Sequence, residues 1–329
     1  MKIQKIKAPI KNNPLIPKNP ADPAGQMVTV NRLLRDLKRR FNNINAKMKE
    51  LVKSQRQIQK LVTNKAYYEY QLDVARLDSI NDYILRLLRN ELLESISGQQ
   101  PFNWFYRSYL EQSFLDGIND AIYSAQNMSD PDIVGTYIAE QVANLNTDMI
   151  NPQQSQRLAL VYGRVFNEMQ GLTDGMKVDL AETLTRGMER GFGIAAITRD
   201  IAKRVQVGFS RAQRIARTEI LGAYRTATRS EQDALNENVY ADSDWQMQLL
   251  WWSALTSTTR PWHAALHGEI KTKQWIDEFY SEKGNAINCY CSQNLILVNV
   301  KTGEVVQQDL LDRMKAQLKV WRVGMKKAA

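Results

Sequence analysis

The most constraining feature of the sequence is an apolar stripe that begins at Val30 and ends at Val62. Apolar residues return at alternating steps of four and three, and Gln55 takes the place of one further member. A repeat held for more than four heptads is typical of a single long helix, because it keeps one seam facing a partner. The seam consists of Val30, Leu34, Leu37, Phe41, Ile44, Met48, Leu51, Ile58 and Val62. The pattern leaves open whether this seam meets its own chain, a second copy or another protein.

Charge is distributed unevenly along the 329 residues. Residues 1–66 contain 16 Lys or Arg and three acids, residues 313–329 contain six Lys or Arg and no acid, and the whole chain carries +9. The part in between therefore carries −10. Basic ends on an acidic body favour contact with a polyanion or an acidic partner, with plain solvated tails as the alternative. We expect non-specific binding of double-stranded DNA, with phosphate contacts from Lys38, Arg39, Arg40, Lys47, Lys49 and Lys53.

Composition along the chain predicts five divisions. Residues 1–26 hold five of the nine prolines and should form an extended Pro/Lys-rich arm, because proline fixes φ and removes a backbone donor. The divisions that follow are a basic heptad helix at 27–66, a helical body at 67–240, a small α+β domain at 241–308 and a basic C-terminal helix or tail at 309–329. The predicted fold class is mainly α, with a zinc-knuckle-like site in the small C-terminal α+β domain.

Local patterns divide the helical body further. Helices are expected at 67–97, 104–127, 131–149, 155–171, 175–190, 194–206 and 209–236. Breaks are expected at Thr173-Asp174-Gly175 and around Gly191 and Gly193. Strands are expected at 245–252 and 295–300, the second turning back through 304–306 as a hairpin, before a final helix at 310–323.

Several classes of protein are excluded by simple counts. No run of 18 or more apolar residues occurs, so we expect no membrane anchor. The basic N-terminus lacks the continuous apolar core of a signal peptide, which favours a protein made in a host cytoplasm. Two cysteines cannot form a disulfide framework.

The scarce ligand-forming residues are concentrated in one window. Both histidines and both cysteines of the chain lie between His263 and Cys291. His263 and His267 would share one face of a helix, and Cys289 and Cys291 would converge on a strand or in a knuckle. Two imidazoles and two thiolates form a closed tetrahedral set suited to structural Zn²⁺. Paired reduced thiols without metal, and a catalytic use, remain the alternatives.

Enzymatic signatures are missing from this window. A metalloprotease helix needs Glu directly after its first His, and that place is Ala264. A Cys–His nucleophile pair has only Asn288, beside Cys289, as a possible orienting amide, and no glycine-rich phosphate loop is present. We therefore expect no enzymatic activity.

Three segments carry a resemblance to a known family. Trp252, the run Thr259-Arg260-Pro261-Trp262-His263-Ala264-Ala265-Leu266-His267-Gly268 and the run Asn288-Cys289-Tyr290-Cys291 resemble the signature of the phage Mu F-like head morphogenesis domain. Upstream, Ala212-Gln213-Arg214-Ile215-Ala216-Arg217-Thr218-Glu219 is similar to the helix that precedes this domain. The resemblance covers about residues 195–300. Within it, we expect Arg217, Thr218 and Glu219 to tie the helix to the small domain structurally.

The resemblance implies a minor head protein of a tailed bacteriophage. Such a protein would bind the portal inside the capsid, near the portal vertex, and contact the genome during assembly, packaging or ejection. Scaffold or capsid protein and a second copy are further expected partners, and the host cytoplasm is the expected place of assembly. The alternative from another class is a nuclease or toxin-like enzyme that uses the His/Cys cluster on nucleic acid. A soluble nucleic-acid-binding regulator is a third hypothesis. The sequence contains no recognisable helix for base recognition and no base-stacking motif.

Overall fold

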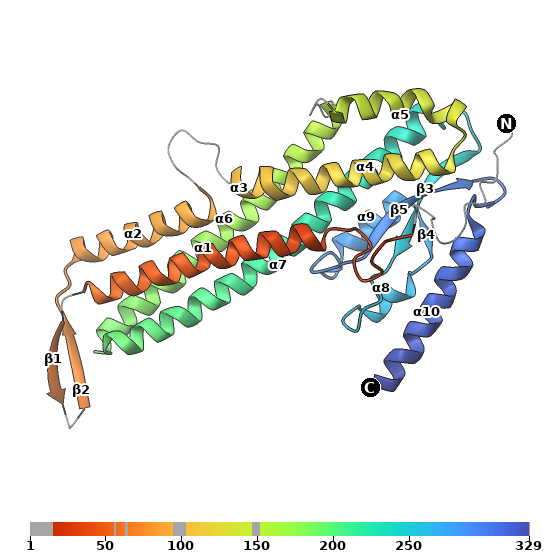
Figure 1. The fold of residues 1–329 in the computed structure, drawn as a ribbon. Coiled ribbons are helices and arrows are strands. Elements are labelled where there is room, and N and C mark those ends of the chain that lie inside the picture. The colour runs from red at the N-terminus through yellow and green to blue at the C-terminus, as the bar shows by residue number, and fades with distance from the viewer. Residues whose placement is uncertain (1–15, 56, 63–64, 95–102, 147–151, 329) are drawn as a thin grey trace. The chain divides into compact units, whose positions relative to one another are not determined.

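The computed structural model describes residues 16–55, 57–62, 65–94, 103–146 and 152–328. The described chain is mainly helical with a small sheet towards its C-terminus, which confirms the predicted fold class (Figure 1). It forms two compact units. The bundle unit comprises residues 31–109 and 162–216, and the sheet unit comprises residues 1–30, 110–161 and 217–329. Within the described ranges, no helix has the length and apolar character needed to cross a membrane.

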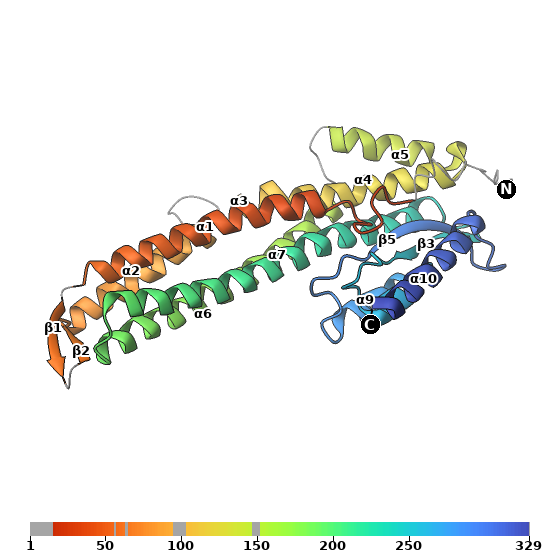
Figure 2. The ribbon, with the colours of Figure 1, turned by 60° about the horizontal axis from the view of Figure 1, so that its bottom comes forward.

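Long helices build the bundle unit. Stretches of four helices run side by side in it, as Figures 1 and 2 show: α1 (Met27–Lys53), α2 (Val74–Leu92), α6 (Pro152–Glu189) and α7 (Ile194–Asn238). A short α3 (Asn103–Phe105) continues directly into a π-helical turn, Tyr106–Leu110. The ring of Phe41 on α1 packs 5.3 Å from that of Phe209 on α7. The seam of α1 is therefore covered by the chain's own helices.

The buried positions on α1 differ from a strict heptad. Leu33 and Val52 are fully buried, whereas Leu34 and Leu51 are half-buried. The buried stripe is Val30, Leu33, Leu37, Phe41, Ile44, Met48 and Val52. The stripe covers 22 residues in six steps, a mean of about 3.67 residues per step, which fits a nearly straight helix better than a 3.5-residue repeat does. The predictions for Leu34 and Leu51 are wrong because apolar neighbours at 33 and 52 fit the straighter face.

The predicted helix through Val62 is also wrong. The helix ends at Lys53, where the side chains of Ser54 and Gln55 donate to the carbonyl of Leu51. The chain then forms an antiparallel hairpin of β1 (Gln57–Val62) and β2 (Lys65–Tyr70), in which Ile58 is 49% exposed. The aromatic residues of β2 and the apolar residues of β1 favour strands locally. The side chain of Val62 lies outside the described residues.

Two expected breaks between helices are absent, because α6 and α7 are each continuous. Thr173, expected at a break, keeps its hydroxyl bonded to the carbonyl of Met169 one turn earlier. Gly208, in the gap between the helices expected at 194–206 and 209–236, lies inside α7, where a Cβ would come 2.5 Å from the sulfur of Met176 on α6. Glycine there permits close packing of the two helices rather than a turn. The stop around Gly191 and Gly193 is confirmed, since α6 ends at Glu189 and α7 begins at Ile194.

The sheet unit contains the predicted strands. β3 (Trp245–Trp252) lies between β4 (Ile270–Lys271) and β5 (Ser292–Asn299), and both pairings are antiparallel. β3 has the predicted bounds, and β5 begins three residues before its predicted start. The expected hairpin through 304–306 is reduced to an isolated bridge between Val298 and Val305.

Helices surround this small sheet. α4 (Glu111–Met128) packs against β5 and is followed by α5 (Pro131–Asn146). The last turns of α7 are fastened to β3 by Gln232, which donates to the carbonyl of Met247. α10 (Gln308–Ala328) closes the chain and contacts the segment after β3, where the indole of Trp321 donates to the carbonyl of Thr256. These contacts surround the region of the sheet that carries the His and Cys residues.

Candidate metal centre

The pairing of β3 with β5 brings the His and Cys segments together. Trp252, the last residue of β3, lies opposite Ser292, the first residue of β5. Antiparallel neighbours place the exit of one strand beside the entrance of the other. The segment after β3 leads into α8 (Pro261–Ala265), which carries His263, and the segment before β5 carries Cys289 and Cys291. Residues far apart in the sequence therefore converge at one end of the sheet.

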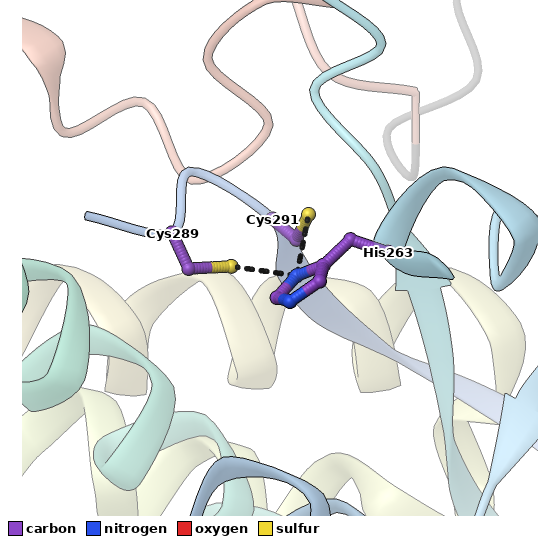
Figure 3. A group of neighbouring side chains, drawn as sticks. All are labelled: His263, Cys289 and Cys291. Atoms are coloured by element: carbon purple, nitrogen blue, oxygen red, sulfur yellow. Dashed lines mark hydrogen bonds between the residues drawn. The ribbon is translucent and has the colours of Figure 1, made fainter. Parts of the chain in front are cut away.

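His263, Cys289 and Cys291 form a compact buried group, here called the His–Cys group (Figure 3). The Nδ1 atom of His263 lies 3.3 Å from the sulfur of Cys289 and 3.9 Å from that of Cys291. All three potential ligand atoms lie within 4.8 Å of one another, and all three side chains are buried. Among the described residues, no other set of three or more His, Cys, Asp or Glu converges in this way.

Aromatic residues and a short helix fix the imidazole of His263. α8 starts with Pro261 at its first turn, a position that proline favours because its missing N–H would have no partner there. The ring of Phe279, on α9 (Lys273–Ser281), lies 5.0 Å from the imidazole, and the ring of Trp251 lies 6.0 Å from it. The Nε2 atom points away from the sulfurs and lies 3.4 Å from the side-chain oxygen of Asn285. A polar partner at this nitrogen is typical of histidines that bind metal through the other one.

The loop before the cysteines is held in place from two sides. Asn288 has a φ of +52°, a left-handed conformation that asparagine tolerates better than most residues. Its backbone N–H donates to the hydroxyl of Thr218 on α7 at 3.1 Å. Arg260 donates to the carbonyls of Asn285 and Ile287. The expectation that Thr218 ties the helix to the small domain is therefore confirmed.

Arg225 supplies a buried positive charge beside the thiols. Its side chain is 2% exposed, its guanidinium lies 4.5 Å from the centre of the Tyr280 ring, and its Nε donates to the carbonyl of Leu221. Within the described residues, its Nη1 and Nη2 atoms have no hydrogen-bond acceptor. A buried guanidinium without an anionic neighbour would be costly, and the charge of Arg225 lowers the pKa of Cys289, which favours a thiolate there.

The two thiols differ in their acid–base behaviour. Burial would raise the pKa of Cys289, but hydrogen bonds with Cys291 and His263 and the charge of Arg225 outweigh it and hold that pKa well below its usual range. The hydrogen bond to Cys289, together with burial, raises the pKa of Cys291 well above its usual range. The lowered pKa favours the thiolate form of Cys289, and the raised pKa favours the thiol form of Cys291. A thiolate is the form of cysteine that binds metals and attacks electrophiles.

His267 does not join the group. α8 ends at Ala265, so His263 and His267 do not share a helical face as the four-residue spacing suggested. Nδ1 of His267 accepts from the backbone N–H of Ser253 at 3.1 Å, and Nε2 lies 3.1 Å from the amide oxygen of Gln317 on α10. Burial lowers the pKa of His267, and the bond to Gln317 offsets part of that effect. His267 is a neutral connecting residue, and its place in the predicted ligand set is wrong.

The predicted phosphate contacts on α1 are only partly available. Arg40 is buried: it donates to the carbonyl of Glu91 at 2.7 Å, pairs with Glu94 and lies over the ring of Trp104. Lys38, Arg39, Lys47, Lys49 and Lys53 are exposed. Arg39 and Lys47 pair with acids three residues away on their own helix. Arg40 is therefore a structural residue of the bundle unit.

Three residues around the His–Cys group were not predicted: Arg225, Tyr280 and Asn285. Arg225 interrupts an apolar run on α7 in which Leu221, Tyr224 and Ala227 are buried. An arginine within an apolar helix face is visible in the sequence. The anionic group that it meets in the fold is not. Tyr280 follows the helical spacing of Trp275, Ile276 and Phe279 on α9, which suggests only a packing role, and Asn285 lies in a turn.

The fold and this group define a class of protein: a helical chain whose C-terminal α+β unit encloses a buried His–Cys group. Residues 178–294 match the family model described as phage Mu protein F like protein, which confirms the resemblance seen in the sequence. This part of the chain therefore relates it to bacteriophage head morphogenesis proteins. No curated protein and no solved structure matches the chain.

Proposed function

We propose that this protein is a minor head protein of a tailed bacteriophage, bound to the portal on the inside of the capsid. The observation that carries the proposal is the match of residues 178–294 to the phage Mu protein F like family. The match includes the end of α6, all of α7, β3, β4, the start of β5 and the His–Cys group. A role in assembly requires a stable scaffold and partner surfaces rather than turnover.

Two experiments, one biochemical and one genetic, test this role. Co-expression with the portal protein of the same phage should give a complex that survives gel filtration. Capsids assembled without this protein should package or infect poorly. A protein with no affinity for portal, together with fully infectious capsids that lack it, would contradict the proposal.

The proposal includes contact with double-stranded DNA through the outer face of α1. Lys38, Lys49 and Lys53 are exposed and form no ion pair within the described residues. The bundle unit as a whole contains 24 Lys or Arg and 14 Asp or Glu, a balance of +10, whereas the sheet unit carries −1. Phosphate binding by such a surface is independent of base sequence and falls steeply with salt.

The His–Cys group has a structural role in this proposal, as a Zn²⁺ site. Tetrahedral zinc with Zn–S of about 2.3 Å and Zn–N of about 2.0 Å places each sulfur roughly 3.5 Å from the nitrogen. The observed nitrogen–sulfur distances of 3.3 and 3.9 Å lie on either side of that value. Zinc would link α8 to the segment before β5 and so close the sheet unit, and the charge of Arg225 would favour the thiolate ligands.

Metal analysis separates this ligand set from the four-ligand set that the sequence suggested. Protein purified without chelators should contain close to one zinc per chain, and Cys289→Ser or His263→Gln should lose it. The matched control is His267→Gln, which should keep it. A wild-type protein that is fully stable without metal would contradict the zinc site and leave the head-assembly proposal untouched.

An enzyme acting on nucleic acid is the second candidate function. The observation that favours it is the thiolate of Cys289 beside the imidazole of His263, a combination that also serves nucleophilic catalysis. Against it, Cys289 is 4% exposed and Cys291 is 2% exposed, which leaves little access for a polymer. Metal-dependent cleavage of DNA that is lost in His263→Ala would favour this second candidate.

A further inference from the structure

A groove of about 420 Å³ lies between α6 and α7 in the bundle unit, near the turn that joins the two helices. The two helices run side by side there, as Figures 1 and 2 show. α7 lines this α6–α7 groove from Ile197 to Val207, a length of about 15 Å at a rise of about 1.5 Å per residue. The groove is therefore about as long as two to three turns of a helix.

Apolar side chains line the groove. Ile197 is 1% exposed, and a Cβ on Gly187 would come 2.7 Å from its side chain, so α6 and α7 approach closely at this point. Phe192 and Val207 also line the groove, and they are 39% and 53% exposed. A partner that covers these two side chains would remove apolar surface from water, which stabilises a complex.

Cations surround the apolar side chains. Four exposed Lys or Arg side chains line the groove: Arg186, Arg190, Lys203 and Arg204. Within the described residues, Arg190 and Arg204 form no ion pair.

Two acids also line the groove, and each pairs with a cation on its own helix. Glu182 pairs with Arg186, and Asp200 pairs with Lys203 at 2.9 Å. The hydrogen bond and charge of Lys203, together with the charges of Arg199 and Arg204, lower the pKa of Asp200. Four cations and two acids leave the lining with two positive charges in excess.

The rest of the sequence does not offer an acid to balance this excess. The residues outside the described ranges contain one acid, Asp148, which precedes the first residue of α6, whereas the groove begins near the other end of that helix at Glu182. Residues 1–15 contain four Lys and no acid. The groove is therefore complementary to negative charge from another molecule.

The combination of apolar and cationic side chains selects the kind of partner. A phosphate backbone would use the cations and gain nothing from covering Phe192 and Val207. An acidic amphipathic helix uses both, because its apolar face covers these side chains while carboxylates beside that face meet the cations. Arginine pairs with a carboxylate through two parallel hydrogen bonds, which also fixes the orientation of the partner.

We propose that the α6–α7 groove binds an acidic amphipathic helix of a partner polypeptide. The apolar face of that helix covers Phe192 and Val207, and its Asp or Glu side chains pair with Arg190 and Arg204. This site depends neither on the proposed role in head assembly nor on DNA contact through α1.

Fluorescence anisotropy with the full chain and a labelled peptide tests the site. The probe is a helical peptide of about 14 residues that repeats Leu at alternating steps of three and four and has Glu and Ala elsewhere. The comparison peptide has the same composition in an order without helical period. The helical peptide should bind about tenfold more tightly or better, because only this peptide presents its leucines on one face.

Single substitutions assign the binding to the groove. Arg190→Gln and Arg204→Gln should each weaken the affinity for the helical peptide about threefold to tenfold, because each removes a charge-assisted partner. Val207→Ser should weaken it as well, because it removes apolar contact surface. The matched controls are Arg86→Gln and Val178→Ser, which change exposed residues of the bundle unit outside the groove and should bind the peptide as the wild type does.

Three results would overturn the proposal. The first is equal binding of the two peptides, and the second is no binding of either. The third comes from a labelled DNA duplex: if Arg190→Gln weakens its binding while Val207→Ser leaves peptide binding unchanged, the groove recognises negative charge alone. Far-ultraviolet circular dichroism of every variant checks that the helical fold is intact.

Discussion

At the scale of single residues, buried polar side chains connect segments that are distant in the sequence. His267 joins the segment after β3 to α10 through Ser253 and Gln317. Glu231, 1% exposed on α7, accepts from the hydroxyl of Tyr137 on α5 at 2.6 Å. Such bonds hold the sheet unit together because each buried group would be costly without its partner.

The buried, neutral state of His267 predicts a pH dependence of stability. Burial lowers the pKa of His267 in the folded state, so the unfolded chain takes up the proton first as pH falls. The contribution of His267 is therefore complete above the unfolded pKa of about 6.5 and is lost as pH falls through the folded pKa. Between pH 7.5 and pH 5, the melting temperature of the wild type should fall more than that of His267→Gln.

Both proteins should be measured without metal, so that release of a bound ion does not contribute. Equal slopes of melting temperature against pH in the two proteins would show that His267 is not buried as described.

The residues of the candidate site were predictable in part. Scarcity alone pointed to His263, Cys289 and Cys291, and the structure brings these together. The exclusion of His267 depends on α8 being only five residues long, and a helix that short leaves no periodic signal. The role of Arg225 depends on which residues meet across the unit, which one sequence does not specify.

At the scale of elements, the apolar face of α1 shows how small differences in period decide burial. A heptad seam and a straight helical face share Val30, Leu37, Phe41, Ile44 and Met48 and differ at their neighbours. The sequence contains leucines at both 33 and 34, so the period was ambiguous there. The hairpin after Lys53 was missed because Ile58 and Val62 continued the seam by spacing alone.

Substitution of the adjacent leucines distinguishes the two periods. Leu33→Ala should lower the free energy of unfolding by about 2–5 kcal/mol, since it empties a fully buried position. Leu34→Ala should cost about half of that or less, because this side chain is only half-buried. Chemical denaturation of both variants measures the difference. If Leu34→Ala lowers the free energy of unfolding more than Leu33→Ala does, the heptad seam is the correct description of α1.

The turn between α6 and α7 is a second place where an element depends on one residue. Gly191 has a φ of +68°, and a Cβ there would overlap the ring of Tyr67 on β2. Its carbonyl also accepts from the backbone N–H of Tyr68 at 3.0 Å. This glycine therefore both reverses the chain and positions the β1–β2 hairpin.

Gly191→Ala should destabilise the bundle unit by about 1–2 kcal/mol from backbone strain alone, with more from displacement of Tyr67. The matched control is Gly171→Ala on α6, where a Cβ meets nothing within 4 Å. That change should stabilise the helix by about 0.5–1 kcal/mol. Thermal unfolding measures both, and a neutral Gly191→Ala would contradict the described turn.

At the scale of the whole molecule, charge is divided between the two units. The bundle unit carries +10 and the sheet unit −1, although both are assembled from separated stretches of sequence. Sequence order concealed part of this division, because residues 162–216 belong to the basic unit but lie in the acidic middle of the chain. The basic segment at the N-terminus was evident from composition alone.

The salt dependence of DNA affinity tests whether the positive charge of the bundle unit contacts DNA phosphates. The triple change Lys38→Gln, Lys49→Gln and Lys53→Gln should reduce the slope of log affinity against log salt by about 2–3, since each phosphate contact contributes about one. The matched control changes Lys315, Lys319 and Arg322 on α10 to Gln, which removes the same charge from the sheet unit. An equal loss in the control would show that α1 is not the DNA-binding surface.

The interleaving of the two units also sets the order in which a ribosome can complete them. The bundle unit has all its segments once residue 216 is synthesised, whereas the sheet unit contains both the first and the last stretches of the chain. Residues 16–30 must therefore wait for residues 217–329 before their unit can close. A recombinant fragment limited to residues 178–294 would contain pieces of both units and all of neither. Such a fragment should aggregate on expression, and truncated versions of this protein should be designed by unit rather than by family boundary.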